Sequence, residues 1–300
     1  MKSMKNRFLK GICAALALSM VMSFTACTDR NKEEDKPEDA PAQQEQQTDD
    51  KTDAKDPAAK PEEDKKEPAV KTPELGPKIA EIRGKNSDVV GWLQIPDTEI
   101  NAAVVHTTNN DFYMRKNELK EYSWTGSYFA DYECKFGPNR DSLLRSTLIY
   151  GHNVNYDDGK DKERFSQLFH FSEMDFAKDH PYIYFSLPEE DLVWEIFAVC
   201  YTTTDFNYIQ VLKDRNTSPE QITEAQMMNI VNEAKLRSEY DYNDVEVTGS
   251  DKIIILSTCS YKYGRRNDVR YLVMGKLLPA DAELHETANI TVNADKKAVA

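Results

Sequence analysis

The chain has 300 residues and carries 52 acidic against 38 basic side chains, which gives a formal net charge of -14. This length allows one or two domains. A nucleic-acid-binding protein would show a basic footprint, so the acidic surplus argues against nucleic acid as a partner.

The N-terminus predicts an export signal. Residues 11–26 are largely apolar, and the basic side chains before them are Lys2, Lys5, Arg7 and Lys10. This length is typical of a signal peptide and short for a membrane-spanning helix. The stretch ends in "SFTAC", which resembles the lipobox of bacterial lipoproteins with Cys27 as the lipidated residue. Two alternatives stay open for residues 1–27, a lipidated Cys27 or an uncleaved signal anchor. Both predict a domain at the extracellular face of the cytoplasmic membrane, held by an N-terminal anchor.

Residues 28–75 predict a disordered, charged tether. Between Thr28 and Glu74 there are 16 acidic residues, 9 basic residues and no aromatic residue. Such a segment buries too little apolar surface to offset the entropy lost on ordering. We therefore place one folded domain at residues 76–288 and a C-terminal tail at residues 289–300.

The domain is predicted to open with a short helix and to continue as strands. Ile79 and Ile82 repeat at helical spacing within residues 77–85. Short apolar segments separated by polar loops and turn residues then predict strands. These segments are residues 89–96, 100–107, 127–133, 146–153, 181–187, 192–204, 251–259 and 269–277. About eight short strands favour a mainly-β fold, a barrel or a sandwich.

A second helix is predicted in the long connection before residues 251–259. Ser218 is a capping residue, Pro219 suits the first helical position, and Gln221 stands at the capping-box position. An apolar stripe is expected from Ile222, Ala225, Val231 and Ala234. A connection of this length in a compact domain is usually functional.

The cysteine count predicts a free thiol. Beyond the signal, the chain keeps Cys134, Cys200 and Cys259. An odd number in an exported domain leaves at least one thiol unpaired. A disulfide between Cys134 and Cys200 is compatible with the sequence but does not follow from it.

Two strand ends carry groups that suit nucleophilic catalysis. Cys259 ends "IIILSTC", and Arg270 opens the next strand. The alternative for Cys259 is that it packs as a small buried hydrophobic residue without a catalytic role. Positive charge beside a thiol favours the thiolate. His152 ends the strand of "TLIYGHN", whereas His106, His170, His180 and His285 share no such context. A cysteine nucleophile needs an acid or base and a group that stabilises the oxyanion. His152 and Arg270 fill these roles.

These residues carry a family resemblance. "LSTC", "YGHN" and "RYLV" resemble the cysteine, histidine and arginine motifs of sortases, the cell-wall transpeptidases of Gram-positive bacteria. "SDVVGWLQIPDTEINAAVV", "TGSYFADYE" and the helix before the cysteine strand are similar to class B sortases. The resemblance covers residues 80–278 and keeps the order His, Cys, Arg. It implies a closed eight-stranded β-barrel with an N-terminal helix and a helical insertion before the cysteine strand.

The resemblance also implies a reaction. Cys259 would attack the Thr carbonyl of a C-terminal sorting motif on an exported protein and form a thioester. Arg270 would stabilise the oxyanion, and His152 would exchange protons with the leaving and incoming amines. The acyl group would pass to an amine of a cell-wall precursor or a pilin. No cofactor is implied. The sequence contains no C-x-x-C or H-E-x-x-H motif that would predict a metal site.

Two alternative functions stay open, and the loop arginines need a separate interpretation. The same site suits a thiol endopeptidase whose thioester is resolved by water. The same barrel suits a non-catalytic surface binding module. Arg265 and Arg266 lie beside Gly264 in a polar loop, and we expect them to be solvated, because an oxyanion donor must be held in place before charge develops.

Overall fold

The computed structural model describes residues 71–208 and 222–299 of the chain. The predicted signal at residues 1–27, with Cys27, lies outside the described residues, as does most of the predicted tether. In the part that is described, no helix is both long enough and apolar enough to cross a membrane. The predicted location, at the extracellular face with an N-terminal anchor, is therefore withdrawn.

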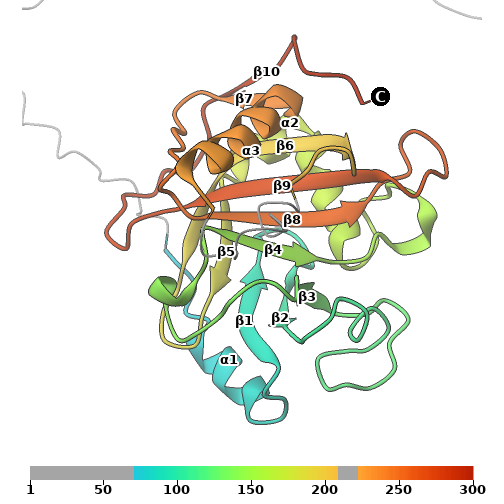
Figure 1. The fold of residues 1–300 in the computed structure, drawn as a ribbon, viewed down its shortest axis with the longest axis vertical. Helices are drawn as coiled ribbons and strands as arrows, with labels where there is room; N and C mark the ends of the chain where they lie inside the picture. Colours follow the sequence, from blue (N-terminus) through green and yellow to red (C-terminus); the bar gives the residue numbers. More distant parts are fainter. Residues whose placement is uncertain (1–70, 209–221, 300) are drawn as a thin grey trace, which may run out of the picture. The chain divides into compact units, whose positions relative to one another are not determined.

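The domain is built on a closed barrel, as the resemblance predicted (Figure 1). Its strands follow the order β1-β2-β3-β4-β8-β9-β6-β5, and β1 pairs with β5 to close the ring. The pairs β2–β3 and β4–β8 are parallel, and the others are antiparallel. The strands are β1 Val89–Gln94, β2 Asn101–Val105, β3 Tyr128–Ala130, β4 Ser146–Tyr150, β5 Tyr182–Ser186, β6 Val193–Thr203, β8 Ile253–Cys259 and β9 Val269–Leu277. Each coincides with a predicted strand.

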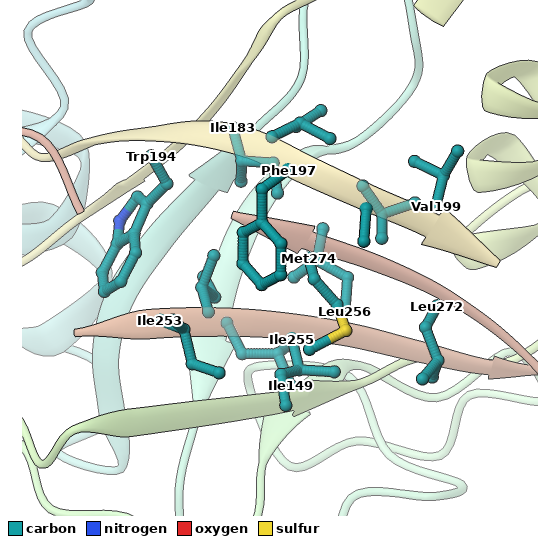
Figure 2. Close-up of a cluster of buried hydrophobic side chains, with 14 of the residues drawn as sticks. Ile149, Ile183, Trp194, Phe197, Val199, Ile253, Ile255, Leu256, Leu272 and Met274 are labelled. Carbon is teal, nitrogen blue, oxygen red and sulfur yellow. The ribbon is translucent and has the colours of Figure 1, made fainter. Parts of the chain in front are cut away.

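The barrel core lies between β4, β5, β6, β8 and β9. Figure 2 shows Ile253, Ile255 and Leu256 of β8 beside Met274 of β9 and Phe197 of β6, all at most 1% exposed. Strand β8 is buried at its first six positions, so both of its faces are covered, and the 3₁₀ helix η3, Phe165–Ser172, packs near it and near β9. A strand covered on both faces has a continuous apolar sequence rather than an alternating one. That explains the uninterrupted "IIIL" before the cysteine.

The two predicted helices are present, with one corrected start. Helix α1 spans Gly76–Arg83, and α3 spans Glu224–Arg237 and packs on β6 (Figure 1). A capping box starts α3: Thr223 Oγ1 accepts from the Gln226 amide (3.2 Å), and Gln226 Oε1 accepts from the Thr223 amide (2.9 Å). The predicted cap at residues 218–221 lies outside the described residues.

The apolar stripe of α3 also needs correction. Val231 and Ala234 are buried as expected, but Ala225 is exposed, and the buried positions of the first turns are Met227 and Ile230. The cause is the helical period. Nine residues separate Ala225 from Ala234, which at 3.6 residues per turn is about two and a half turns, so Ala225 lies on the face opposite the buried stripe.

Several short elements were not predicted. Helix α2, Met174–Asp179, follows η3 in the connection between β4 and β5, and strands β7, Tyr240–Tyr242, and β10, Ile290–Val292, form a separate pair. Single turns occur at η1, Arg140–Ser142, and η2, Val154–Tyr156. Elements of this length bury too few side chains to produce a periodic signal.

At both predicted domain boundaries, residues assigned to the tether or to the tail are part of the folded structure. Leu75, the last residue of the predicted tether, is 1% exposed and packs with Tyr182 and Tyr184. Its amide donates to Asp191 Oδ1 (2.9 Å). At the other end, β10 lies within the predicted tail and pairs with β7. The domain boundaries themselves stay predictions.

Candidate active site

Cys259 is the last residue of β8 and lies opposite Arg270 of β9. The antiparallel register pairs Thr258 with Tyr271 and then Cys259 with Arg270. The Ser260 amide still donates to the Val269 carbonyl (3.1 Å), so the ladder extends past the thiol. Residues directly opposite in such a pair have Cβ atoms about 4.5–5.5 Å apart on one face. The backbone therefore holds the thiol and the guanidinium stem side by side.

The Arg270 side chain is held at its own strand end. Its Nη1 donates to the carbonyls of Asn267 (2.8 Å) and Val269 (2.9 Å). Both bonds use one nitrogen of the planar fork. A guanidinium held in this way keeps N–H donors on its other nitrogens.

The neighbouring loop arginines are engaged differently. Arg266 binds Asp268 through two bonds, Nε to Oδ1 (3.0 Å) and Nη2 to Oδ2 (2.7 Å). The Arg265 guanidinium lies 5.9 Å from the ring centre of Tyr156. Both arginines are exposed and follow Gly264, whose φ is +89°. Neither position has the ladder pairing that holds Arg270.

His152 reaches the same place because β4 and β8 run parallel. The register sets Tyr150 of β4 beside Ser257 of β8. Two residues beyond this pair, the chains reach His152 and Cys259. Parallel strands end at the same edge of a sheet, so a histidine and a cysteine that are far apart in sequence become neighbours in space.

Gly151 leaves room for the ring of Phe165 at the end of β4. A Cβ atom on Gly151 would lie 2.7 Å from the ring of Phe165, closer than packed atoms tolerate. The Gly151 amide donates to the Ser257 carbonyl (3.3 Å), and its carbonyl accepts from Thr258 Oγ1 (2.8 Å). The turn before His152 is thus fastened directly to the residues before Cys259.

The environment of His152 favours the neutral imidazole. Burial lowers the pKa of His152, and the cations Arg115 and Arg164 lower it further, against a hydrogen bond to the Met114 carbonyl that raises it. His152 Nε2 lies 2.8 Å from that carbonyl oxygen. A carbonyl only accepts, so Nε2 carries a hydrogen, and Nδ1 is the nitrogen that gains and loses a proton.

Cys259 and His152 line one pocket of about 170 Å³. The long connection between β2 and β3, residues 106–127, contributes Trp124, which is 48% exposed, and η2 contributes Tyr156, which is 55% exposed. The lining residues are Arg115, Trp124, Thr125, His152, Asn153, Val154, Tyr156, Cys259 and Tyr261. Arg270 is not among them, so the structure joins Arg270 to the site through the ladder with Cys259.

The other described cysteines are unsuited to be nucleophiles. Cys134 and Cys200 are buried and free, so the disulfide left open by the sequence is not formed. Burial raises the pKa of each thiol to about 12. The reactive species is the thiolate, and both side chains stay protonated at neutral pH. Among the described cysteines, Cys259 is the one that is partly exposed.

Some pocket residues were missed by sequence reasoning. Arg115 and Trp124 come from residues 106–127, and Asn153 and Tyr156 follow His152. The length of the connection at residues 106–127 is a signal, because long loops in compact domains are usually functional. The four histidines without shared context lie outside this pocket: His106, His170, His180 and His285.

A closed barrel that sets a half-buried thiol and an imidazole in one pocket defines a cysteine enzyme of the acyl-transfer class. No family model matches the chain. Sortase B of Listeria monocytogenes is 34% identical over 209 residues, which cover 68% of this chain and 76% of the relative. Sortase B of Staphylococcus aureus is 26% identical over 203 residues, 67% of this chain and 75% of the relative.

Solved structures agree. A Staphylococcus aureus sortase B–substrate complex superposes with a TM-score of 0.57 at 26% identity, covering 69% of this chain and 87% of the other. The chain belongs to the class B sortase family and is a cysteine transpeptidase. The non-catalytic binding module that the sequence left open is therefore set aside.

Proposed function

We propose that this sortase cleaves a C-terminal sorting motif after Thr and joins the freed carbonyl to an amine of a cell-wall precursor or a pilin. Cys259 is the nucleophile, His152 the general acid and base, and Arg270 the oxyanion donor. The observation that carries this assignment is the juxtaposition at one barrel edge. Cys259 shares a pocket with His152 and a ladder position with Arg270.

In the first half-reaction, the Cys259 thiolate adds to the Thr carbonyl carbon. The carbonyl oxygen becomes an oxyanion, to which Arg270 donates hydrogen bonds. As the tetrahedral intermediate collapses, the C–N bond breaks, and the leaving nitrogen takes a proton from the protonated form of His152, the form that accompanies the Cys259 thiolate at the start of the cycle. The products are a thioester on Cys259, a free amine and a neutral imidazole.

The role of Arg270 is supported by the state of the backbone amides after the thiol. The Ser260 N–H donates to a carbonyl of β9 (3.1 Å), and the Tyr261 N–H donates to Asp158 (2.8 Å). Both donors are occupied, so they are not free to receive an oxyanion at Cys259. Arg270 is the cross-strand donor that remains, and a donor on a strand is held in place before charge develops.

In the second half-reaction, an acceptor amine adds to the thioester carbonyl. Neutral His152 takes the proton that the amine nitrogen loses, and the Cys259 thiolate leaves as the new amide forms. Water competes with the amine at this step and would give hydrolysis instead. The lowered pKa of His152 keeps the base form available for this half of the cycle.

The test is to trap the acyl-enzyme with a library of pentapeptides that contain Pro and Thr. Mass spectrometry should find an adduct on Cys259 whose mass equals the peptide portion that ends at Thr. Addition of a primary amine should convert the adduct into ligated peptide, whereas a thiol endopeptidase would release acid only.

Cysteine variants provide the matched control. We expect Cys259→Ala to form no adduct, whereas Cys134→Ala and Cys200→Ala should still form it, because their thiols are buried. An adduct on Cys259→Ala, or equal inactivity of all three variants with folds intact, would contradict the assignment.

A further inference from the structure

The segment after His152 and the segment after Cys259 are joined by a hydrogen-bonded clasp. Asn153 Nδ2 donates to the Cys259 carbonyl (3.0 Å) and to Asp158 Oδ1 (3.0 Å). The same Oδ1 accepts from the Tyr261 amide (2.8 Å), and Asp158 Oδ2 accepts from Ser260 Oγ (2.7 Å). One carboxylate therefore holds both residues that follow the thiol, as well as the residue that follows the histidine.

The clasp is anchored in the buried part of the domain. Asn153 is 8% exposed, and Ser166 and Ser260 are fully buried. Asn153 Oδ1 accepts from Ser166 Oγ (3.1 Å), and the same hydroxyl accepts from the Val154 amide (2.9 Å). The amide of Asn153 thus uses both of its ends and cannot rotate without breaking bonds to η3, to Asp158 and to the Cys259 carbonyl.

We propose that Asn153 and Asp158 are positioning residues that set the direction of the Cys259 backbone relative to His152. This rests on the proposed function, in which the thiolate and the imidazole act on one substrate carbonyl. Catalytic groups must be held close to the reactive geometry, and a misplacement of about 1 Å can reduce the rate about 100-fold. The bonds of Asp158 go to Asn153, Ser260 and Tyr261, so it acts on His152 only through the chain.

The contacts predict that Asp158 acts through geometry rather than through its charge. An asparagine at this position keeps an oxygen that accepts from Asn153 and from the Tyr261 amide. Its NH₂ group can donate to Ser260 Oγ, because a hydroxyl both donates and accepts. Asp158→Asn should therefore preserve the clasp, whereas Asp158→Ala removes all of its bonds to the thiol segment.

The adjacent Asp157 is the matched control. It carries the same charge in the same loop, is exposed, and its Oδ1 accepts from the Gly159 amide (3.0 Å) within its own turn. Asp157→Ala thus removes one negative charge near the pocket without touching the Cys259 segment. We expect its kcat and KM to stay within about twofold of the wild type, since surface substitutions of this kind have small effects.

The experiment measures kcat and KM for transpeptidation of the library peptide that forms the acyl-enzyme. The melting temperature of each variant shows whether it is folded. Asp158→Ala should lower kcat by about 10- to 100-fold and leave KM within about threefold. Asp158→Asn should recover kcat to within about threefold of the wild type. A purely structural role would lower the amount of folded enzyme instead, and kcat per titrated Cys259 thiol would not change.

A double variant tests whether the two residues act as a unit. If they do, Asn153→Ala with Asp158→Ala loses no more kcat than the worse single variant, because removing either residue already opens the clasp. Additive losses would mean separate roles and would overturn the proposal. If Asp158→Ala does not fold, Ser260→Ala takes its place, because it removes the hydrogen bond from Ser260 Oγ to Asp158. It should lower kcat by a smaller factor, and an unchanged kcat in Ser260→Ala would count against the proposal.

The outcomes separate this proposal from the one on which it rests. If Cys259→Ala still transfers the peptide, the proposed function is wrong, whatever Asp158 does. If Cys259→Ala is inactive but Asp158→Ala matches Asp157→Ala, only the clasp is wrong. The clasp is also overturned if Asp158→Asn is as impaired as Asp158→Ala, or if the loss appears in KM alone.

Discussion

Replacement of Arg270 with alanine is the sharpest test of how this site stabilises charge. The side chain starts from the ladder position opposite Cys259, and its Nη1 is tied to the carbonyls of Asn267 and Val269. A donor that is already held needs no reorganisation when the oxyanion forms. If Arg270 is the oxyanion donor, as proposed, the free energy of its hydrogen bonds is available to the transition state.

The expected size follows from measured oxyanion donors. Removal of one donor raises the activation free energy by about 3 kcal/mol, which corresponds to a factor of about 100 in rate. Arg270→Ala should lose at least this much in kcat. Arg270→Lys should recover only part, because an ammonium group lacks the planar fork that can hold a backbone carbonyl and an oxyanion together.

The assay is steady-state transpeptidation, with thermal melting to show that each variant is folded. Arg265→Ala and Arg266→Ala are the matched controls, since they remove the same charge from the exposed loop, five and four residues before Arg270. We expect them mainly to raise KM, and this effect should fade as salt screens the charge. The reasoning would be refuted if Arg270→Ala stayed active while either loop variant lost about 100-fold or more in kcat.

Three further predictions follow from the same geometry. Arg115→Gln should raise the pKa of His152, because a nearby cation is lost, and an NMR titration of the imidazole measures it. In the proposed mechanism His152 acts first as an acid, so the alkaline limb of the rate profile should move to higher pH. An unchanged titration would show that Arg115 does not act on the imidazole. Thr258→Val should lower the free energy of unfolding by about 1–3 kcal/mol, because the buried carbonyl of Gly151 loses its donor; urea denaturation checks it, and a smaller loss would mean that this carbonyl finds another partner. Deletion of residues 1–70 should leave kcat and KM on short peptides unchanged, and a loss of activity in a folded product would place part of the site in the deleted segment.

Much of the barrel was predictable because its strands have strong local signals. Ile253–Leu256 is rich in β-branched residues, Val193–Cys200 combines β-branched and aromatic residues, and the structure places both in the barrel. The helix before the cysteine strand was predicted; α3 begins after the capping box at Thr223, whereas the cap predicted at residues 218–221 lies outside the described residues. The short pair of β7 and β10 had no such signal, because each strand has three residues and buries too few side chains to show a period.

By itself, the sequence was enough to single out Cys259, His152 and Arg270, because each stands at the end of a recognisable strand and an odd number of thiols required an explanation. Only the tertiary structure decided which of these ends meet. The parallel pairing of β4 with β8 brings His152 to Cys259, and the antiparallel pairing of β8 with β9 brings Arg270 to it. The clasp through Asp158 and the pocket wall from residues 106–127 also appear only in the fold. The physical reason is that strand order and register are set by closing the barrel over its shared core, through contacts between residues that local sequence patterns do not connect.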